Sequence, residues 1–189
     1  MSTPEKPKGP DRLPGDPTLK QLVERIVRVD HAGEYGAVRI YEGQMAIIGN
    51  TKAGPTIEKM LNQEREHLST FEDLLVNRGV RPTAFLPLWH AAGFALGAAT
   101  ALMGEKAAMA CTVAVEETID EHYAGQIKAL TPYEEESILR KTCAQFREEE
   151  LEHRRIGIEH APEQMPGYDV LTTAIKAGSK LAIWLSTRI

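Results

Sequence analysis

The segment Glu150-Leu151-Glu152-His153 decides the predicted fold, because its pattern repeats an earlier one at Glu64-Arg65-Glu66-His67. Both segments lie in runs whose apolar residues recur three and four apart, which is the period of a helix with one buried face. Residues three apart on a helix face the same way, so the Glu and the His of each segment can bind the same metal ion. The repeat therefore predicts two helices that each contribute a Glu-x-x-His pair to a metal site.

Each of these helices follows another predicted helix that carries a glutamate on its apolar side. Glu34 lies on the apolar stripe of the first helix, and Glu116 lies on that of the helix before residue 150, whereas Glu117 shares a face with polar residues. One Glu from each of two helices and a Glu-x-x-His from each of two others form the ligand set of a four-helix bundle that binds two metals. The predicted ligands are Glu34, Glu64, His67, Glu116, Glu150 and His153.

The chemistry of this ligand set favours iron. Four carboxylates on core faces are costly to bury unless cations neutralise them, and two divalent ions nearly do so. Oxygen-rich ligation with one histidine per metal suits iron or manganese better than a closed structural zinc site. Carboxylates also stabilise the higher oxidation state that oxygen activation needs, so two iron ions are the predicted cofactor.

The same apolar spacing predicts an all-α protein. Helices are expected from residue 18 to 48, from the loop at 51–55 to about 78, and over 109–130, 133–160 and 168–187. Alternating strand patterns bounded by hairpin turns are absent from the sequence. A length of 189 residues fits one domain over 18–189, and five prolines in residues 1–17 predict a disordered polar tail.

Composition excludes several other classes of protein. There are 22 Lys and Arg against 27 Asp and Glu, a net charge of -5 and a pI near 5.7, the opposite of what a nucleic-acid-binding protein needs. Two isolated cysteines support neither a disulfide framework nor a zinc ribbon. The tail has no secretory or transit features, which favours the cytoplasmic face of a bacterial membrane.

Residues 82–104 contain no Asp, Glu, Lys or Arg. We interpret them as a helix that lies on or partly in one leaflet of a membrane, because prolines, glycines and many alanines dilute the run. A buried hairpin helix and a full span are the alternatives. The C-terminal helix, with Leu181, Ile183 and Trp184 beside Lys176 and Lys180, is either a second part of that surface or simple bundle packing.

Four further residues lie near the predicted ligands. His122 and Tyr123 follow Glu116 by about two turns, which suits a proton or redox role, although a core position is the commoner outcome for such a tyrosine. Asp30 and His31 lie one turn before Glu34 and are candidates to hold a ligating histidine by a hydrogen bond.

Four segments together resemble the demethoxyubiquinone hydroxylases, a membrane-associated branch of the ferritin-like di-iron carboxylate proteins. The resemblance runs from about Leu19 to the C-terminus, and none of the six predicted ligands departs from the family pattern. The segments are Val29-Asp30-His31-Ala32-Gly33-Glu34-Tyr35-Gly36-Ala37, Gln63-Glu64-Arg65-Glu66-His67-Leu68, Ala108-Met109-Ala110-Cys111-Thr112-Val113-Ala114-Val115-Glu116-Glu117 and Glu149-Glu150-Leu151-Glu152-His153.

The resemblance implies a ferritin-like four-helix bundle with additional apolar, membrane-facing helices, in which Glu64 and Glu150 bridge two irons. The implied reaction is the hydroxylation of a demethoxy-polyprenyl benzoquinol by O2 in ubiquinone biosynthesis. The implied location is the inner membrane, on the cytoplasmic face in a bacterium or on the matrix side in a mitochondrion. Implied partners are the quinol, the membrane surface, a lipid-binding accessory protein and further copies of the chain.

The residues leave three matters open. The electron donor is either a nicotinamide such as NADH acting through the quinone or a separate reductase. A ferritin-like iron store or ferroxidase would use the same ligands, although a run of 23 uncharged residues fits a storage cage poorly. A lipid-binding membrane module with no metal is the third possibility. For the quinone itself, we expect the head to lie beside Glu34 and Tyr123, with the tail passing Phe85, Leu88 and Phe94.

Overall fold

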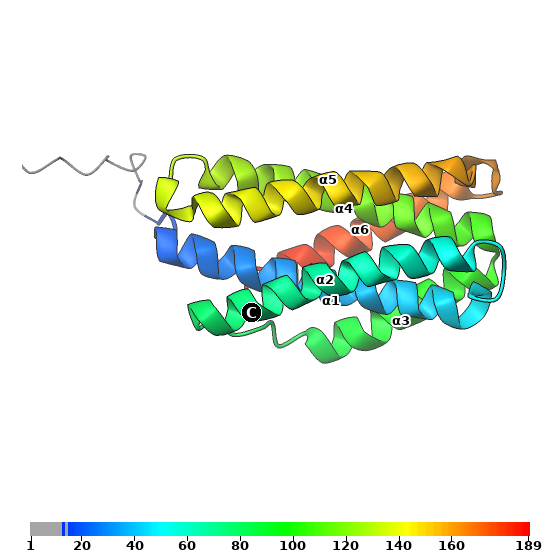
Figure 1. Cartoon of the computed structure of the whole chain (residues 1–189), viewed down its shortest axis with the longest axis horizontal. Helices are drawn as coiled ribbons and strands as arrows, with labels where there is room; N and C mark the ends of the chain where they lie inside the picture. The colour runs from blue at the N-terminus through cyan, green and yellow to red at the C-terminus, as the bar shows by residue number, and fades with distance from the viewer. Residues whose placement is uncertain (1–12, 14) are drawn as a thin grey trace, which may run out of the picture.

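The computed structural model describes residue 13 and residues 15–189, and this part of the chain folds into helices without any strand (Figure 1). The all-α prediction is therefore confirmed for these residues. Residues 1–12 and 14, most of the segment predicted to be a disordered tail, lie outside the described part. The six helices are α1 (Leu19–Ile48), α2 (Gly54–Arg78), α3 (Leu86–Leu102), α4 (Glu105–Leu130), α5 (Ser137–Glu159) and α6 (Tyr168–Ser186).

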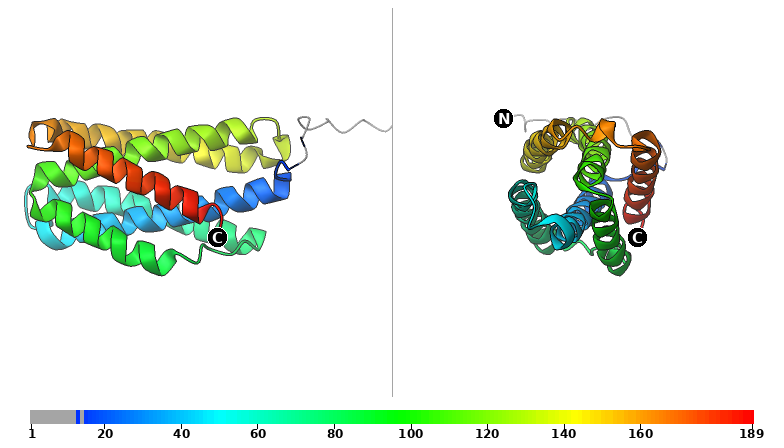
Figure 2. Two further views of the ribbon diagram at one scale, coloured as in Figure 1. Left: turned by 180° about the vertical axis from the view of Figure 1, so that it is seen from behind. Right: turned by 90° about the vertical axis from the view of Figure 1, so that its right-hand side faces the viewer.

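The helices are arranged as a four-helix bundle with two additional helices on one side. Viewed along the bundle, α2 and α5 lie on one side, α1 and α4 in the middle, and α3 and α6 on the opposite side (Figure 2). α3 packs mainly on α1, and α6 packs mainly on α4. The bundle core therefore lies between α1, α2, α4 and α5, and α3 and α6 cover the other side of α1 and α4.

Local sequence explains where the helices begin and end. Thr18 caps α1 in a capping box with Gln21, and Gly79 ends α2 in the left-handed conformation with φ of 62°. The expected helix at 109–130 begins earlier, at Glu105, directly after Gly104 with φ of 111°. The expected helix at 133–160 begins at Ser137, because residues 134–136 form a 3₁₀ turn.

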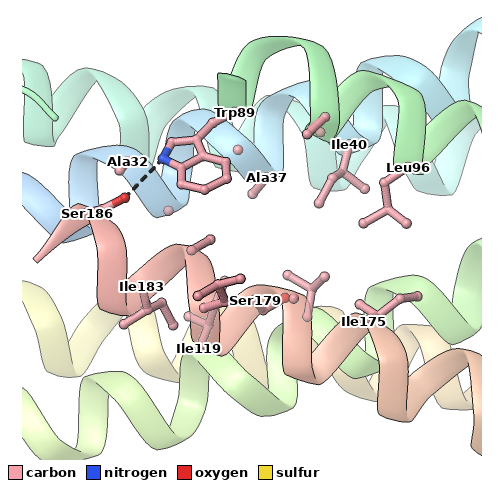
Figure 3. A pocket seen from close by; sticks show the side chains of 18 of the residues that line it. Ala32, Ala37, Ile40, Trp89, Leu96, Ile119, Ile175, Ser179, Ile183 and Ser186 are labelled. Atoms are coloured by element: carbon pink, nitrogen blue, oxygen red, sulfur yellow. Dashed lines mark hydrogen bonds between the residues drawn. The ribbon is translucent and has the colours of Figure 1, made fainter. Parts of the chain in front are cut away.

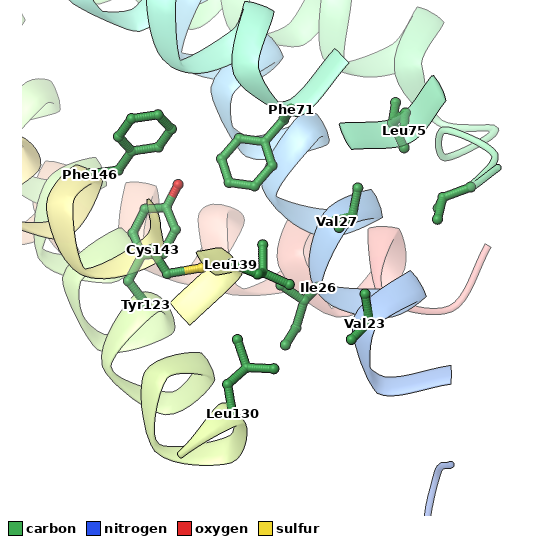
Figure 4. Packing of buried hydrophobic residues seen from close by; sticks show 11 residues of the cluster. Val23, Ile26, Val27, Phe71, Leu75, Tyr123, Leu130, Leu139, Cys143 and Phe146 are labelled. Carbon is green, nitrogen blue, oxygen red and sulfur yellow. The ribbon is translucent and has the colours of Figure 1, made fainter. Parts of the chain in front are cut away.

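Two apolar clusters lie toward opposite ends of the bundle core, and polar side chains occupy the region between them. The first joins residues 23–27 of α1, 71–75 of α2, 123–130 of α4 and 139–146 of α5 (Figure 4). The second joins residues 38–48 of α1, 57–61 of α2, and Ala108 and Met109 of α4. On α1, α2 and α4 the predicted ligands occur between these segments, and on α5 they occur between residue 146 and the partly buried Ile156, which packs against the second cluster. The six predicted ligands thus lie near the middle of the bundle's length, with an apolar cluster toward each end.

Glycines allow α3 to approach α1 more closely than ordinary helix packing does. A Cβ added to Gly97 would lie 1.9 Å from the Ile40 carbonyl oxygen, and one added to Gly43 would lie 2.2 Å from the Phe94 carbonyl oxygen. The Gly93-x-x-x-Gly97 pattern thus packs α3 directly against the backbone of α1. Among the described helices, none is long and apolar enough to cross a bilayer.

We predict that Gly97→Ala destabilises the protein by about 1–3 kcal/mol, because the new methyl group meets backbone atoms that cannot move aside. Gly125→Ala on the exposed side of α4 is the matched control, since a Cβ there meets nothing within 4 Å. It should raise the free energy of unfolding by about 0.5–1 kcal/mol through helix propensity. Urea unfolding followed by circular dichroism measures both values; equal effects of the two substitutions would contradict the close packing.

Candidate metal centre

The six predicted ligands come together inside the bundle. Glu34 comes from α1, Glu64 and His67 from α2, Glu116 from α4, and Glu150 and His153 from α5. Each of the six side chains is at most 2% exposed. Charged groups are almost never buried to this extent unless they are paired or bind a metal. The four helices therefore concentrate acidic groups where an unneutralised charge is most costly.

The six side chains form two overlapping groups of four. In each group, one ligand atom per residue lies within 4.8 Å of the others. The first group contains Glu34, Glu64, His67 and Glu150, and the second contains Glu64, Glu116, Glu150 and His153. Glu64 and Glu150 belong to both groups, as they would if they bridged two adjacent ions.

Several atoms at the centre lack a hydrogen-bond partner. His153 Nδ1 lies 3.0 Å from Glu64 Oε1, but the two are not in hydrogen-bond geometry. Polar atoms buried in this way normally have a partner, so a cluster of exceptions needs an explanation. The unpartnered atoms are Oε2 of Glu34, both carboxylate oxygens of Glu64, Oε2 of Glu116, Oε2 of Glu150 and Nδ1 of His153. All are atoms that a cation could bind.

Burial changes the protonation of these groups. It raises the pKa of Glu34, Glu64 and Glu116 above the usual range for a carboxyl group, and their mutual repulsion raises it further for Glu64 and Glu116. Burial also raises the pKa of Glu150, but the proximity of His153 and a hydrogen bond from His67 outweigh it and bring the pKa to about 2. In the protein without metal, protons therefore take the place of cations, and metal binding must release them.

The surrounding carboxylates raise the pKa of both histidines. Burial lowers the pKa of His67, but its hydrogen bond with Glu150 and the nearby Glu34 carboxylate outweigh burial and raise the pKa to about 12. The pKa of His153 is also raised, because the attraction of Glu150, whose Oε2 lies 3.2 Å from His153 Nδ1, outweighs burial. A metal ion must displace the Nδ1 proton of each ring before the ring can coordinate it.

A tyrosine donates a hydrogen bond to each glutamate that belongs to only one group. The Tyr123 hydroxyl lies 2.5 Å from Glu34 Oε1, and the Tyr41 hydroxyl lies 2.9 Å from Glu116 Oε1. Burial, with the nearby carboxylates, raises the pKa of both tyrosines well above its usual value, so both remain donors. Tyr41 was not predicted as a residue of the site, although it follows Glu34 by the same seven positions that separate Tyr123 from Glu116.

The outer ring nitrogens of the two histidines also have partners. His67 Nε2 lies 2.7 Å from Glu149 Oε2, and His153 Nε2 lies 3.2 Å from Gln63 Oε1. These partners immediately precede Glu150 and Glu64 in the sequence. The expectation that Asp30 or His31 would fill this role is wrong, because the histidine of each helix reaches across to the other Glu-x-x-His helix instead.

Asp30 belongs to a separate polar cluster beside the centre. Its Oδ1 accepts a hydrogen bond from Gln126 Nε2 at 2.5 Å and lies 3.3 Å from His122 Nε2. Burial raises the pKa of Asp30 despite these partners. The side chain of His122 is 23% exposed, so this cluster extends from the buried carboxyl group to the edge of the bundle. His31 stacks on Tyr35, with the ring centroids 6.4 Å apart.

Comparison with known proteins agrees with this arrangement of side chains. The family model described as ubiquinone biosynthesis protein COQ7 matches residues 21–186, which include all six converging side chains. The chain belongs to the COQ7 family. The match extends through α6, so the family resemblance includes the two additional helices as well as the bundle.

Named relatives of the COQ7 family cover most of the chain. A protein of Rhodospirillum rubrum named 3-demethoxyubiquinol 3-hydroxylase is 56% identical over 95% of this chain and 84% of its own length. A human protein named NADPH-dependent 3-demethoxyubiquinone 3-hydroxylase, mitochondrial, is 53% identical over 92% of this chain and 81% of its own length. A yeast protein named 5-demethoxyubiquinone hydroxylase, mitochondrial, is 41% identical over 89% of this chain and 78% of its own length.

The protonation of the centre leads to a prediction about pH. The pKa values of Glu64, Glu116 and His67 are higher in the folded, metal-free protein than in the unfolded chain, so their stabilising contribution is lost as the pH rises. Between about pH 6 and pH 9 the Tm of the chelator-treated protein should therefore fall. Glu150 does not contribute to the fall of Tm between these pH values, because its lowered pKa changes stability only below about pH 4.5.

Glu64→Gln tests both the slope and the ligand assignment. It should make the fall in Tm with pH shallower and abolish metal binding, because the amide has no charge to neutralise. Glu66→Gln is the control, since Glu66 lies in the same motif but is exposed. Circular dichroism melts and metal analysis measure the two effects. A Glu64→Gln protein with normal metal content would refute the assignment.

Proposed function

We propose that this chain is a di-iron monooxygenase that hydroxylates the ring of a demethoxy-polyprenyl benzoquinol in ubiquinone biosynthesis. The observation that carries the proposal is the pair of overlapping Glu/His groups with unpartnered carboxylate oxygens at mid-bundle. The names of the relatives supply the substrate class and the hydroxylation.

The residues at the centre fit two iron ions. Four carboxylates and two imidazoles give each ion oxygen-rich ligation with one nitrogen, which suits iron or manganese better than structural zinc. Glu34 and His67 would hold one ion, Glu116 and His153 the other, and Glu64 and Glu150 would bridge them. When bound, such a pair of ions supplies the activation of O2 and the transfer of one oxygen atom to the ring.

The chain's own residues fix the ligands and handle protons around them. Tyr123 and Tyr41 hold one oxygen each of Glu34 and Glu116 and leave the second oxygen for a metal. We assign proton or redox roles to Tyr123 and His122. Tyr123 holds its proton on the hydroxyl oxygen that faces Glu34. His122 Nε2 can exchange a proton with Asp30 Oδ1 at the edge of the bundle.

An apolar groove behind α1 and α4 offers a place for the isoprenoid tail. The groove lies between α3 and α6 and has a volume of about 550 Å³ (Figure 3). Its floor contains Gly33 and Ala37, which flank Glu34 along α1, and Val115, which precedes Glu116 on α4. Neither Glu34 nor Tyr123 lines the groove, so a quinone head on this floor would lie against Gly33 and Ala37 on the outer side of α1, with an apolar channel for the tail.

The residues that line the groove differ from those expected to contact the tail. The α3 residues that line the groove are Trp89, Ala92, Gly93 and Leu96. Trp89 Nε1 donates a 3.0 Å hydrogen bond to Ser186 Oγ across the groove (Figure 3). None of the three residues expected to contact the tail, Phe85, Leu88 and Phe94, lines the groove. Leu88 is half exposed, and the Phe94 ring lies 5.0 Å from the Arg39 guanidinium.

We infer that the outer sides of α3 and α6 contact a membrane surface. Large apolar side chains that are more than half exposed cluster there, which is unusual for a surface that faces only water. They are Leu88, Leu102, Met103, Val170, Leu181, Trp184 and Ile189. Lys180 pairs with Glu121 of α4 at 2.9 Å, so it also ties α6 to the bundle. Several relatives are named mitochondrial, and we propose an inner membrane as the location, on the matrix side in a mitochondrion or on the cytoplasmic face in a bacterium.

Hydroxylation of a quinol separates this proposal from an iron store. The chain loaded with iron, incubated with a demethoxyquinol and O2, should yield a product heavier by one oxygen atom, and each protein should turn over many molecules. Mass spectrometry of the quinol measures this, with NADPH and NADH compared as electron donors, since several relatives are named NADPH-dependent. Mineral formation from excess ferrous salt without quinol oxygenation would favour the ferroxidase alternative.

Filling the groove tests its role. Gly178 lines the groove, and a Cβ there meets nothing within 4 Å, so Gly178→Leu should fill space without disturbing the fold. We expect KM for a long-tailed quinol to rise about tenfold, because the tail loses apolar contact area, and KM for a tail-less analogue to change little. Ala177→Leu, one residue away and outside the groove, is the control. Equal KM changes for both quinols would count against the groove.

A further inference from the structure

The centre has an internal two-fold pattern that relates α1 and α2 to α4 and α5. The pairs in this pattern are Glu34 with Glu116, Tyr41 with Tyr123, Glu64 with Glu150, and His67 with His153. Each pair has the same residue type, and each tyrosine contacts the glutamate of the other half: Tyr41 of α1 contacts Glu116 of α4, and Tyr123 of α4 contacts Glu34 of α1. Two metal positions built only from these pairs would be chemically equivalent.

The two halves differ at the residue that precedes each glutamate belonging to both groups. Gln63 precedes Glu64, whereas Glu149 precedes Glu150. Both side chains face a histidine on the opposite helix, at His153 Nε2 and His67 Nε2 respectively. The two halves of the centre therefore differ by one charge at equivalent positions.

The two contacts also differ in geometry. The N–H at His67 Nε2 donates to a carboxylate oxygen of Glu149 at 2.7 Å, whereas that at His153 Nε2 donates to an amide oxygen of Gln63 at 3.2 Å. Gln145 donates from Nε2 to the other oxygen of Glu149 at 2.9 Å and so holds this carboxylate in place. Charge-assisted hydrogen bonds are shorter and roughly twice as strong as neutral ones.

A stronger acceptor on the outer nitrogen makes the inner nitrogen a better metal ligand. A carboxylate on Nε2–H fixes the ring orientation and increases the electron density at Nδ1, which is the atom that faces the shared glutamates. Both rings present Nδ1 to the shared glutamate of the other half, at 3.1 Å from His67 to Glu150 Oε1 and at 3.0 Å from His153 to Glu64 Oε1. The difference between Glu149 and Gln63 therefore acts on atoms in equivalent places.

We propose that Glu149 is a positioning residue that makes the two metal positions unequal. The position formed by Glu34, Glu64, His67 and Glu150 binds its ion more tightly and fills first. The position formed by Glu64, Glu116, Glu150 and His153 fills second. This inference rests on the proposed di-iron function, because it concerns the order in which the two ions bind.

Stepwise metal titration of the whole chain tests the order. Ferrous ion, added without oxygen and in competition with a chelator, should bind the unaltered chain in two resolved steps. Glu149→Gln should weaken the first step about 10- to 100-fold, the usual loss when a partner of a ligating histidine is removed, so that the two steps merge. Gln63→Glu should strengthen the second step, and the double exchange should restore two steps in the opposite order.

A spectroscopic readout separates this role from a purely structural one. With one equivalent of ⁵⁷Fe(II), the Mössbauer spectrum of the unaltered chain should contain one quadrupole doublet, and that of Glu149→Gln should contain two. Glu148→Gln, the exposed neighbour on α5, is the matched control and should retain one doublet. A substitution that only loosened the fold would lower the Tm without producing the second doublet.

The outcomes distinguish this inference from the proposed function. A chain that binds no iron refutes the di-iron proposal itself. Two outcomes refute only the proposed difference in affinity between the two metal positions. They are an unaltered chain that binds two ions with equal affinity, and a Glu149→Gln protein in which both binding steps are unchanged. If Glu149→Gln weakens both steps by the same factor, Glu149 acts on the whole centre and the assignment to one position is wrong.

Discussion

The need to neutralise four carboxyl groups in the interior of one bundle governs the rest of this structure. Glu34, Glu64, Glu116 and Glu150 are almost fully buried, and ionised groups in such a place repel one another and lack water. Burial raises the pKa of three of them, and the proximity of the two histidines lowers that of Glu150. The apolar clusters at both ends of the bundle stabilise the fold enough to tolerate this polar centre. Neutralisation by protons or by cations is therefore a condition of folding as well as of function.

The sequence predicted the helices and the convergence of the six side chains because both follow from short-range periodicity. Glu and His three apart face the same way, and an apolar stripe shows which glutamate faces inward, as at Glu116 rather than Glu117. Glu117 indeed lies outside the centre, where it pairs with Arg154 and Lys176. Helix boundaries were predicted less exactly, because Gly104 with positive φ lets α4 begin directly after α3.

The parts that the sequence did not reveal depend on contacts between helices. Nothing in the local pattern around Gln63 or Glu149 shows that each residue reaches the histidine of the opposite helix, and Asp30, one turn from Glu34, was the nearer candidate. Only the crossing of α2 and α5 brings Glu149 to His67. The residues that line the groove were not predicted, for the same reason. Apolar character alone did not show which side of residues 82–104 faces α6.

Helix α1 joins these features, because its two sides serve different parts of the molecule. Its inner side carries Glu34 and Tyr41 into the polar centre, and its outer side presents Gly33 and Gly43 to the groove and to α3. Small residues on the outer side let α3 pack backbone against backbone and leave space next to Glu34. A larger side chain there would move α3 away or fill the groove, even though it would leave every ligand unchanged. The composition of α1 is therefore constrained on both sides, by the polar centre on one and by the close packing of α3 and the groove on the other.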